Sequence, residues 1–83
     1  MPLYMDVHNL GAAVTLEDVA KAHAADLEHQ EKHGVRYLQY WVDEPNGRIF
    51  CLAEAPDAEA ANTVHREAHG LVADEIHLVR EGS

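Results

Sequence analysis

The stretch RIFCLAEAPDAEAANTVHREAHG, residues 48–70, decides the fold of this chain. It starts with a short apolar run of the kind found in buried strands, and Pro56 ends that run. Asp57 then suits the N-terminal cap of a helix, and the strong helix formers from Ala58 onward continue until Gly70, which suits the C-terminal cap. The stretch therefore predicts a strand around residues 49–53, a corner, and a helix that begins at Ala58.

Four further elements follow from patterning on either side of this stretch. Alternation and helical spacing predict a strand at 2–8, a helix at about 16–33, a strand at 35–43 and a last strand at 74–79, before a polar tail at 80–83. The Pro-Asn-Gly turn at 45–47 makes the second and third strands a hairpin. The order β-α-β-β-α-β predicts an α+β, ferredoxin-like fold in one domain, residues 1–83, with two helices on one face of a four-stranded antiparallel sheet.

The other face of this sheet is expected to lie open. Residues 2–8 alternate, so that Leu3, Met5 and Val7 share one face. We assign the opposite set to the open face together with the aromatic and polar residues of neighbouring strands, which gives Tyr4, Asp6, His8, Tyr37, Trp41 and His77. A face so rich in aromatic residues is seldom left in water, so we expect a second copy of the chain to cover it and form a homodimer.

Charge and composition exclude several classes of partner. The chain has 83 residues, six Lys and Arg against 15 Asp and Glu, and a formal net charge of -9. Such a field repels phosphate backbones and anionic lipid surfaces but attracts cations, so nucleic acid and membranes are not expected partners. No secretory signal is visible at the start of the sequence, which predicts a cytoplasmic location.

Seven histidines are the main chemical signal. His65 and His69 lie four residues apart in the predicted second helix, so both side chains project from one face and can ligate one divalent metal ion. The alternative is that both are ordinary surface histidines, the second being favoured near the helix C-terminus by the helix dipole.

Other candidate ligands come from the first strand and the first helix. Asp6 and His8 share one face of the strand and can both reach an ion, or else form a polar edge of the dimer interface. His23 lies on the apolar stripe of the helix with Asp26 one turn further on, and is either a ligand or a hydrogen-bonded core histidine. The single Cys51 is a buried small hydrophobe or a soft metal ligand.

Three motifs resemble those of a known family. MDVH at 5–8, CLAEAPDAEA at 51–60 and VHREAHG at 64–70 are similar to a family of very short bacterial proteins, catalogued as a domain of unknown function, with a nickel-binding, ferredoxin-like member. The resemblance implies a homodimer, nickel held by histidine and acidic side chains, and a role in nickel sequestration or tolerance. The positions that the resemblance transfers to this chain are His8, His65 and His69, the histidines that lie within the shared motifs.

We therefore expect a homodimeric nickel-binding protein, with zinc as the competing metal and His8, His65, His69, His23, Asp26 and Asp6 as candidate ligands. A different class is a small dimeric enzyme, in which the open sheet face encloses an organic substrate, His8 is the base, and Tyr4, Tyr37 and Trp41 shape the pocket. Only fold analogy favours this second reading, so non-enzymatic binding is preferred. A third is a bare interaction module, in which the histidines are incidental.

Overall fold

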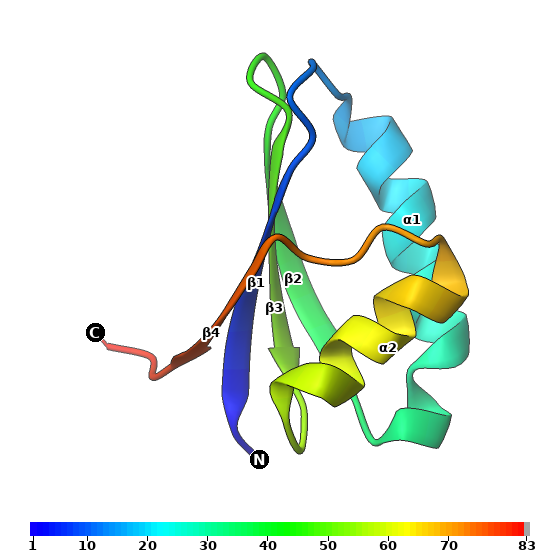
Figure 1. Cartoon of the computed structure of the whole chain (residues 1–83), viewed down its shortest axis with the longest axis vertical. Helices are drawn as coiled ribbons and strands as arrows, with labels where there is room; N and C mark the ends of the chain where they lie inside the picture. Colours follow the sequence, from blue (N-terminus) through cyan, green and yellow to red (C-terminus); the bar gives the residue numbers. More distant parts are fainter. Residues whose placement is uncertain (83) are drawn as a thin grey trace.

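The computed structural model describes residues 1–82, so Ser83, the last residue of the predicted domain and tail, lies outside the described residues. In chain order the elements are β1 (Leu3–Asn9), α1 (Leu16–His29), the 3-10 helix η1 (Glu31–His33), β2 (Arg36–Asp43), β3 (Arg48–Glu54), α2 (Ala58–Ala68) and β4 (Glu75–Val79). The strands pair antiparallel in the order β2-β3-β1-β4, and both helices cover one face of the sheet (Figure 1). The predicted ferredoxin-like fold is confirmed.

Both helices begin at side-chain caps, and the one at Asp57 was predicted from the sequence. The Thr15 hydroxyl accepts a hydrogen bond from the Asp18 N–H at 3.1 Å, and the Asp57 carboxylate accepts one from the Ala60 N–H at 2.7 Å. Each cap satisfies an N–H group that the first turn of a helix leaves without a backbone partner. These two caps set the positions at which α1 and α2 leave the sheet.

The first helix is shorter than the predicted span of 16–33. It ends at His29, and the chain tightens into η1, where the His33 N–H donates to the Gln30 carbonyl at 3.1 Å. Gly34 follows with a φ of 69°, a left-handed conformation that glycine adopts without a steric penalty. The last predicted turn is therefore a 3-10 turn, which helical spacing alone does not distinguish from an α-helix.

The inner face of β1 is the opposite of the one we predicted. Asp6 and His8 are buried beneath the helices, with 1% and 3% of their surface exposed, whereas Met5 and Val7 alternate with them on the open face. Tyr4, which is partly buried, packs against the core on the same inner side. Alternation shows which residues share a face, but we had assumed that the polar set is the solvated one. Here hydrogen bonds compensate for the burial of that set.

A β-bulge in β2 explains a second error. Tyr37 pairs with Ala53 and the next paired residue is Gln39 with Leu52, so Leu38 is an extra residue in the ladder. The extra residue reverses the parity of the strand and turns Tyr37 inward, where 4% of its surface is exposed. Trp41 does lie on the open face, as predicted, and is 46% exposed.

The helices and the sheet enclose a core of small apolar side chains together with four buried polar ones. The apolar members are Val19, Val35, Tyr37, Ile49, Cys51, Ala53, Ala55, Ala61 and Val64, and the polar members are Asp6, His8, Asp26 and His65. Burying polar groups is costly unless each finds a partner. The middle of this small domain is therefore built around a polar cluster.

Candidate metal centre

Helix α2 carries the central residue of this cluster. Ala61, Val64 and His65 are its buried residues, so one face of the helix lies against the sheet. Ala61 has no exposed surface, and its carbonyl accepts a hydrogen bond from the Tyr37 hydroxyl at 3.2 Å. This close approach brings the His65 ring into the interior, where 1% of its surface is exposed.

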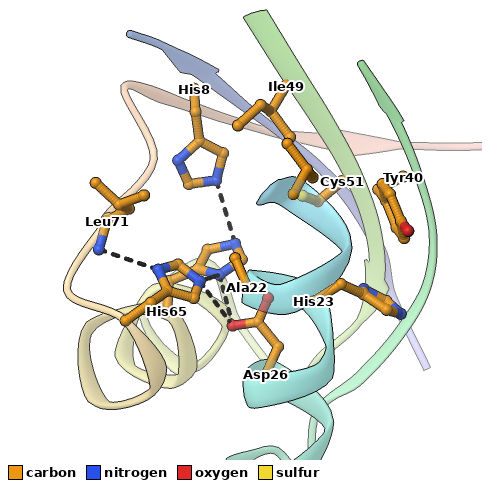
Figure 2. Close-up of a pocket in the computed structure, with 11 residues that line it drawn as sticks. His8, Ala22, His23, Asp26, Tyr40, Ile49, Cys51, His65 and Leu71 are labelled. Carbon is orange, nitrogen blue, oxygen red and sulfur yellow. Dashed lines mark hydrogen bonds and ion pairs between the residues drawn. The ribbon is translucent and has the colours of Figure 1, made fainter. Parts of the chain in front are cut away.

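The two ring nitrogens of His65 face two different carboxylates. Its Nε2 lies 2.9 Å from Asp6 Oδ2 on β1, and its Nδ1 lies 2.9 Å from Asp26 Oδ1 on α1. On the β1 side, His8 Nε2 is 3.3 Å from His65 Nε2 (Figure 2). The same His8 Nε2 is 3.1 Å from Asp6 Oδ1. The Tyr37 hydroxyl donates to Asp6 Oδ2 at 2.8 Å. The Tyr37 hydroxyl also lies 2.8 Å from His65 Nε2. The ring of His65, on α2, therefore contacts residues of β1, β2 and α1.

The geometry also fixes the proton position on His69. Its Nδ1 accepts a hydrogen bond from the Leu71 N–H at 3.1 Å, so a neutral ring carries its proton on Nε2. That Nε2 lies 3.0 Å from Asp26 Oδ1, to which it donates. Asp26 therefore accepts hydrogen bonds from both His65 and His69.

Electrostatics favour a charged His65 between ionised carboxylates. Burial alone would lower the pKa of His65, but hydrogen bonds with Asp26 and Asp6 outweigh it and raise this pKa to about 11. Burial alone would raise the pKa values of Asp6 and Asp26, yet hydrogen bonds from His65 and from the other histidines hold both below the ordinary range. Two ionised carboxylates therefore flank one imidazolium in the buried cluster.

This charge state predicts how the metal-stripped protein responds to pH. Because the pKa of His65 is raised, its stabilising contribution is complete below its ordinary pKa of 6.5 and is lost as the pH rises toward about 11. We expect the free energy of unfolding to fall by about 1.4 kcal/mol per pH unit between pH 6.5 and 9. Urea unfolding in the presence of a chelator measures this slope.

Two other buried groups add to the loss only at higher pH. Burial raises the pKa of Cys51 to about 11 and also raises that of Tyr37, from ordinary values of 9.0 and 10.0. The slope of the free energy of unfolding below pH 9 therefore reports the raised pKa of His65. A free energy of unfolding that stays level over that interval would show that His65 is not held as an imidazolium.

Among residues 1–82, two groups of side chains have donor atoms close enough to share one ion. The larger group is Asp6, His8, Cys51 and His65, all buried, and the smaller is Asp26, His65 and His69; within each group the donor atoms lie within 4.8 Å of one another. Five of the six candidate ligands thus meet in two sets that share His65. The histidine pair in α2 and the Asp6–His8 pair in β1, singled out separately from their spacing, belong to one cluster.

His23 is the candidate that neither set includes. Its ring packs against Tyr40 with the centroids 4.6 Å apart, and burial lowers its pKa. Cys51 and Tyr37 were not among our six candidate ligands. Cys51 belongs to the larger group of donors, and Tyr37 donates a hydrogen bond to Asp6. Cys51 had been weighed as a soft ligand, whereas the inward position of Tyr37 depends on a bulge that strand alternation does not reveal.

Most of the residues proposed for an enzyme site on the open sheet face lie on the other side of the sheet. His8 and Tyr37 are buried beneath the helices, and Tyr4 lies on their side of the sheet, so none of them can line a pocket on the opposite face. Of that group, only Trp41 lies on the open face.

Fold and cluster together define a class: a small ferredoxin-like protein with buried imidazole, carboxylate and thiol side chains of the kind that ligate transition metals. The chain belongs to the family described as nickel responsive protein SCO4226-like, whose model matches residues 4–79. The crystal structure of SCO4226 from Streptomyces coelicolor A3(2) is similar to this chain, with 41% sequence identity, a TM-score of 0.90, and coverage of 98% of this chain and 99% of that one. A comparison with curated proteins found no match.

The family resemblance inferred from the sequence motifs is therefore confirmed. Within the part of the chain that the structure describes, no helix has the length and apolar character needed to cross a membrane.

Proposed function

We propose that this chain is a cytoplasmic nickel-binding protein that acts as a homodimer in metal sequestration or tolerance. The proposed site holds one divalent ion per chain between Asp6, His8, Cys51 and His65. The observation that carries the proposal is that these four buried side chains, from β1, β3 and α2, bring their donor atoms within 4.8 Å of one another. The nickel-responsive description of the family supports the choice of metal.

The spacing of the donor atoms suits a shared ion. Two donors that each lie about 2.0–2.1 Å from one ion are about 2.9–3.4 Å apart in octahedral or tetrahedral arrangements. His65 Nε2 lies 2.9 Å from Asp6 Oδ2 and 3.3 Å from His8 Nε2, and His8 Nε2 lies 3.1 Å from Asp6 Oδ1. Asp6, His8 and His65 would therefore need little rearrangement to ligate one ion.

The proton positions favour the larger set of donors over the smaller one. His65 can bind the ion through Nε2 while its Nδ1–H still donates to Asp26, an arrangement in which a carboxylate orients a metal-bound histidine. The His69 Nε2 carries a proton as long as Nδ1 accepts from the Leu71 N–H, so it has no lone pair to offer. We therefore assign Asp26 and His69 to positioning rather than to ligation.

The charge of the cluster supports cation binding as well. Asp6 and Asp26 are both ionised in this buried site, so their carboxylates attract a cation. On ligation, His65 Nε2 would release its proton to solvent, and Cys51 would release its thiol proton to become a thiolate donor. A divalent ion would thus take the place of two protons, so the net charge of these side chains would stay the same.

The donor set narrows the metal to a few ions. Imidazole and thiolate donors with one carboxylate suit nickel, zinc and copper better than magnesium or calcium. Nickel lies above cobalt and iron in the order of divalent affinities, and zinc is its natural competitor. The family description favours nickel among them.

The open sheet face supports the homodimer. Pairing across the sheet places an apolar row and its neighbours on the side away from the helices: Leu3, Met5, Val7, Trp41, Phe50, Leu52 and Val79. Trp41 is 46% exposed, and β1 and β3 at the centre of this face are otherwise uncovered in the single chain (Figure 1). A two-fold contact between two such faces would remove this apolar surface from water.

The Asp26→Asn variant tests the proposed division between ligands and positioning residues. We expect calorimetric titration with nickel to give one ion per chain for both proteins, with affinity lowered by about 10- to 100-fold in the variant, because an amide orients His65 less well than a carboxylate. Asp18→Asn, an exposed change in the same helix, is the matched control and should leave the affinity unchanged. An Asp26→Asn protein that binds no nickel would make Asp26 a ligand instead.

A further inference from the structure

A small cavity lies directly beside the proposed donors. His8, Cys51 and His65 line it together with the apolar side chains of Val19, Ile49 and Leu71, and Figure 2 labels all of these except Val19. The cavity has a volume of about 20 Å³. A cavity needs about 10–15 Å³ on this scale to hold one water molecule, so there is room for one ligand atom and little more.

The position of this space bears on the coordination of the ion. Structural metal sites of proteins are closed by protein donors on all sides, whereas reactive sites keep one position open for an exogenous ligand. Here three of the four proposed donors line the same small cavity, so one side of an ion at that site would face free space rather than protein.

His23 supplies a second, independent observation. Its Nδ1 is buried and has no hydrogen-bond partner among the described residues, and His23 lines the same cavity. A buried polar atom without a partner is uncommon and calls for a ligand, a water molecule or an ion. Apart from His23, the polar groups around the cavity belong to the cluster itself or to Tyr40.

We infer that the cavity holds one exogenous ligand of a single heavy atom, water, hydroxide or fluoride, bound to the metal ion with His23 as its hydrogen-bond partner. This inference rests on the proposed metal site. The metal ion would then have one coordination position that exchanges its ligand with solvent. His23 would contact that ligand rather than the metal ion.

Cobalt and fluoride provide the test, because the visible absorption of Co²⁺ reports its coordination number. We expect the Co²⁺-loaded protein to show a saturable spectral change on addition of fluoride. In Ala22→Leu, which extends a cavity-lining side chain, Co²⁺ should still bind but fluoride should no longer change the spectrum. Ala24→Leu, on the exposed side of the same helix, is the matched control and should behave as the unchanged protein.

A His23→Phe variant separates the role of the histidine. Loss of one hydrogen bond should weaken fluoride binding by about tenfold while Co²⁺ affinity stays the same. A protein that binds Co²⁺ but whose spectrum ignores fluoride, or one in which Ala22→Leu responds as the unchanged protein does, would overturn the exogenous-ligand site and leave the metal site intact. Failure to bind Co²⁺ at all would overturn both.

Discussion

Replacing His65 by glutamine is expected to lower nickel affinity by at least about 100-fold, because His65 is a proposed ligand and is also the residue on which both carboxylates converge. Isothermal calorimetry on tag-free, metal-stripped protein measures the loss. His77→Gln is the matched control, because His77 is exposed and lies on β4, and its affinity should equal that of the unchanged protein.

His65 is also central to the fold, so a second variant keeps this prediction testable. Cys51→Ala removes one proposed donor and leaves a small apolar residue in the core, where the reduced volume costs little. We expect it to remain folded by circular dichroism and to bind nickel at least about tenfold more weakly. Full nickel affinity in both variants would place the metal elsewhere on the chain.

Replacing Met5 by glutamate is expected to convert the proposed dimer into a monomer. Met5 lies in the middle of the open face, opposite Leu52 and His77, so a carboxylate there would be buried without a partner in the proposed interface. We expect the dissociation constant of the dimer to rise by at least about 100-fold in sedimentation velocity experiments.

Leu27→Glu is the matched control for the interface. Leu27 is equally large and apolar and 46% exposed, but it lies on α1, on the helical side of the sheet. Its dimer should be as stable as that of the unchanged protein. An unchanged protein that sediments as a monomer, or a Met5→Glu protein that stays dimeric while Leu27→Glu does not, would remove the open face as the interface.

Local signals were enough to predict the order of the elements. Asp57 is a cap whose side chain accepts a hydrogen bond from the first turn of α2, as predicted. Gly47 closes the predicted hairpin with a φ of 69°, and a Cβ at that position would collide with the Ala12 carbonyl oxygen. Each of these signals acts over a few residues, which is why the sequence reveals them.

Errors arose where the outcome depends on parts of the chain far apart in sequence. The buried face of β1 is the polar one because His65, which is 57 residues from His8, and Tyr37 satisfy Asp6. The bulge at Leu38 turned Tyr37 inward against the simple alternation. Neither effect leaves a local trace, since both follow from which partners the fold supplies.

For the candidate site, too, local spacing predicted some groupings of residues but not the contacts between distant parts of the chain. Spacing within one element grouped His65 with His69, and Asp6 with His8, and the structure joins these pairs. Spacing could not show that the pairs share one imidazole ring, nor that Cys51 completes the larger set. The position of the His69 proton, which separates ligation from positioning, depends on the Leu71 N–H.

X-ray absorption at the nickel edge of the nickel-loaded protein would show whether the ion binds to the four buried side chains of the proposed site. We predict one buried ion per chain. Its protein donors are two histidine imidazoles, one carboxylate oxygen and the sulfur of Cys51. A spectrum of nitrogen and oxygen donors without sulfur, unchanged in the Cys51→Ala protein, would contradict this ligand set and exclude Cys51 as a donor.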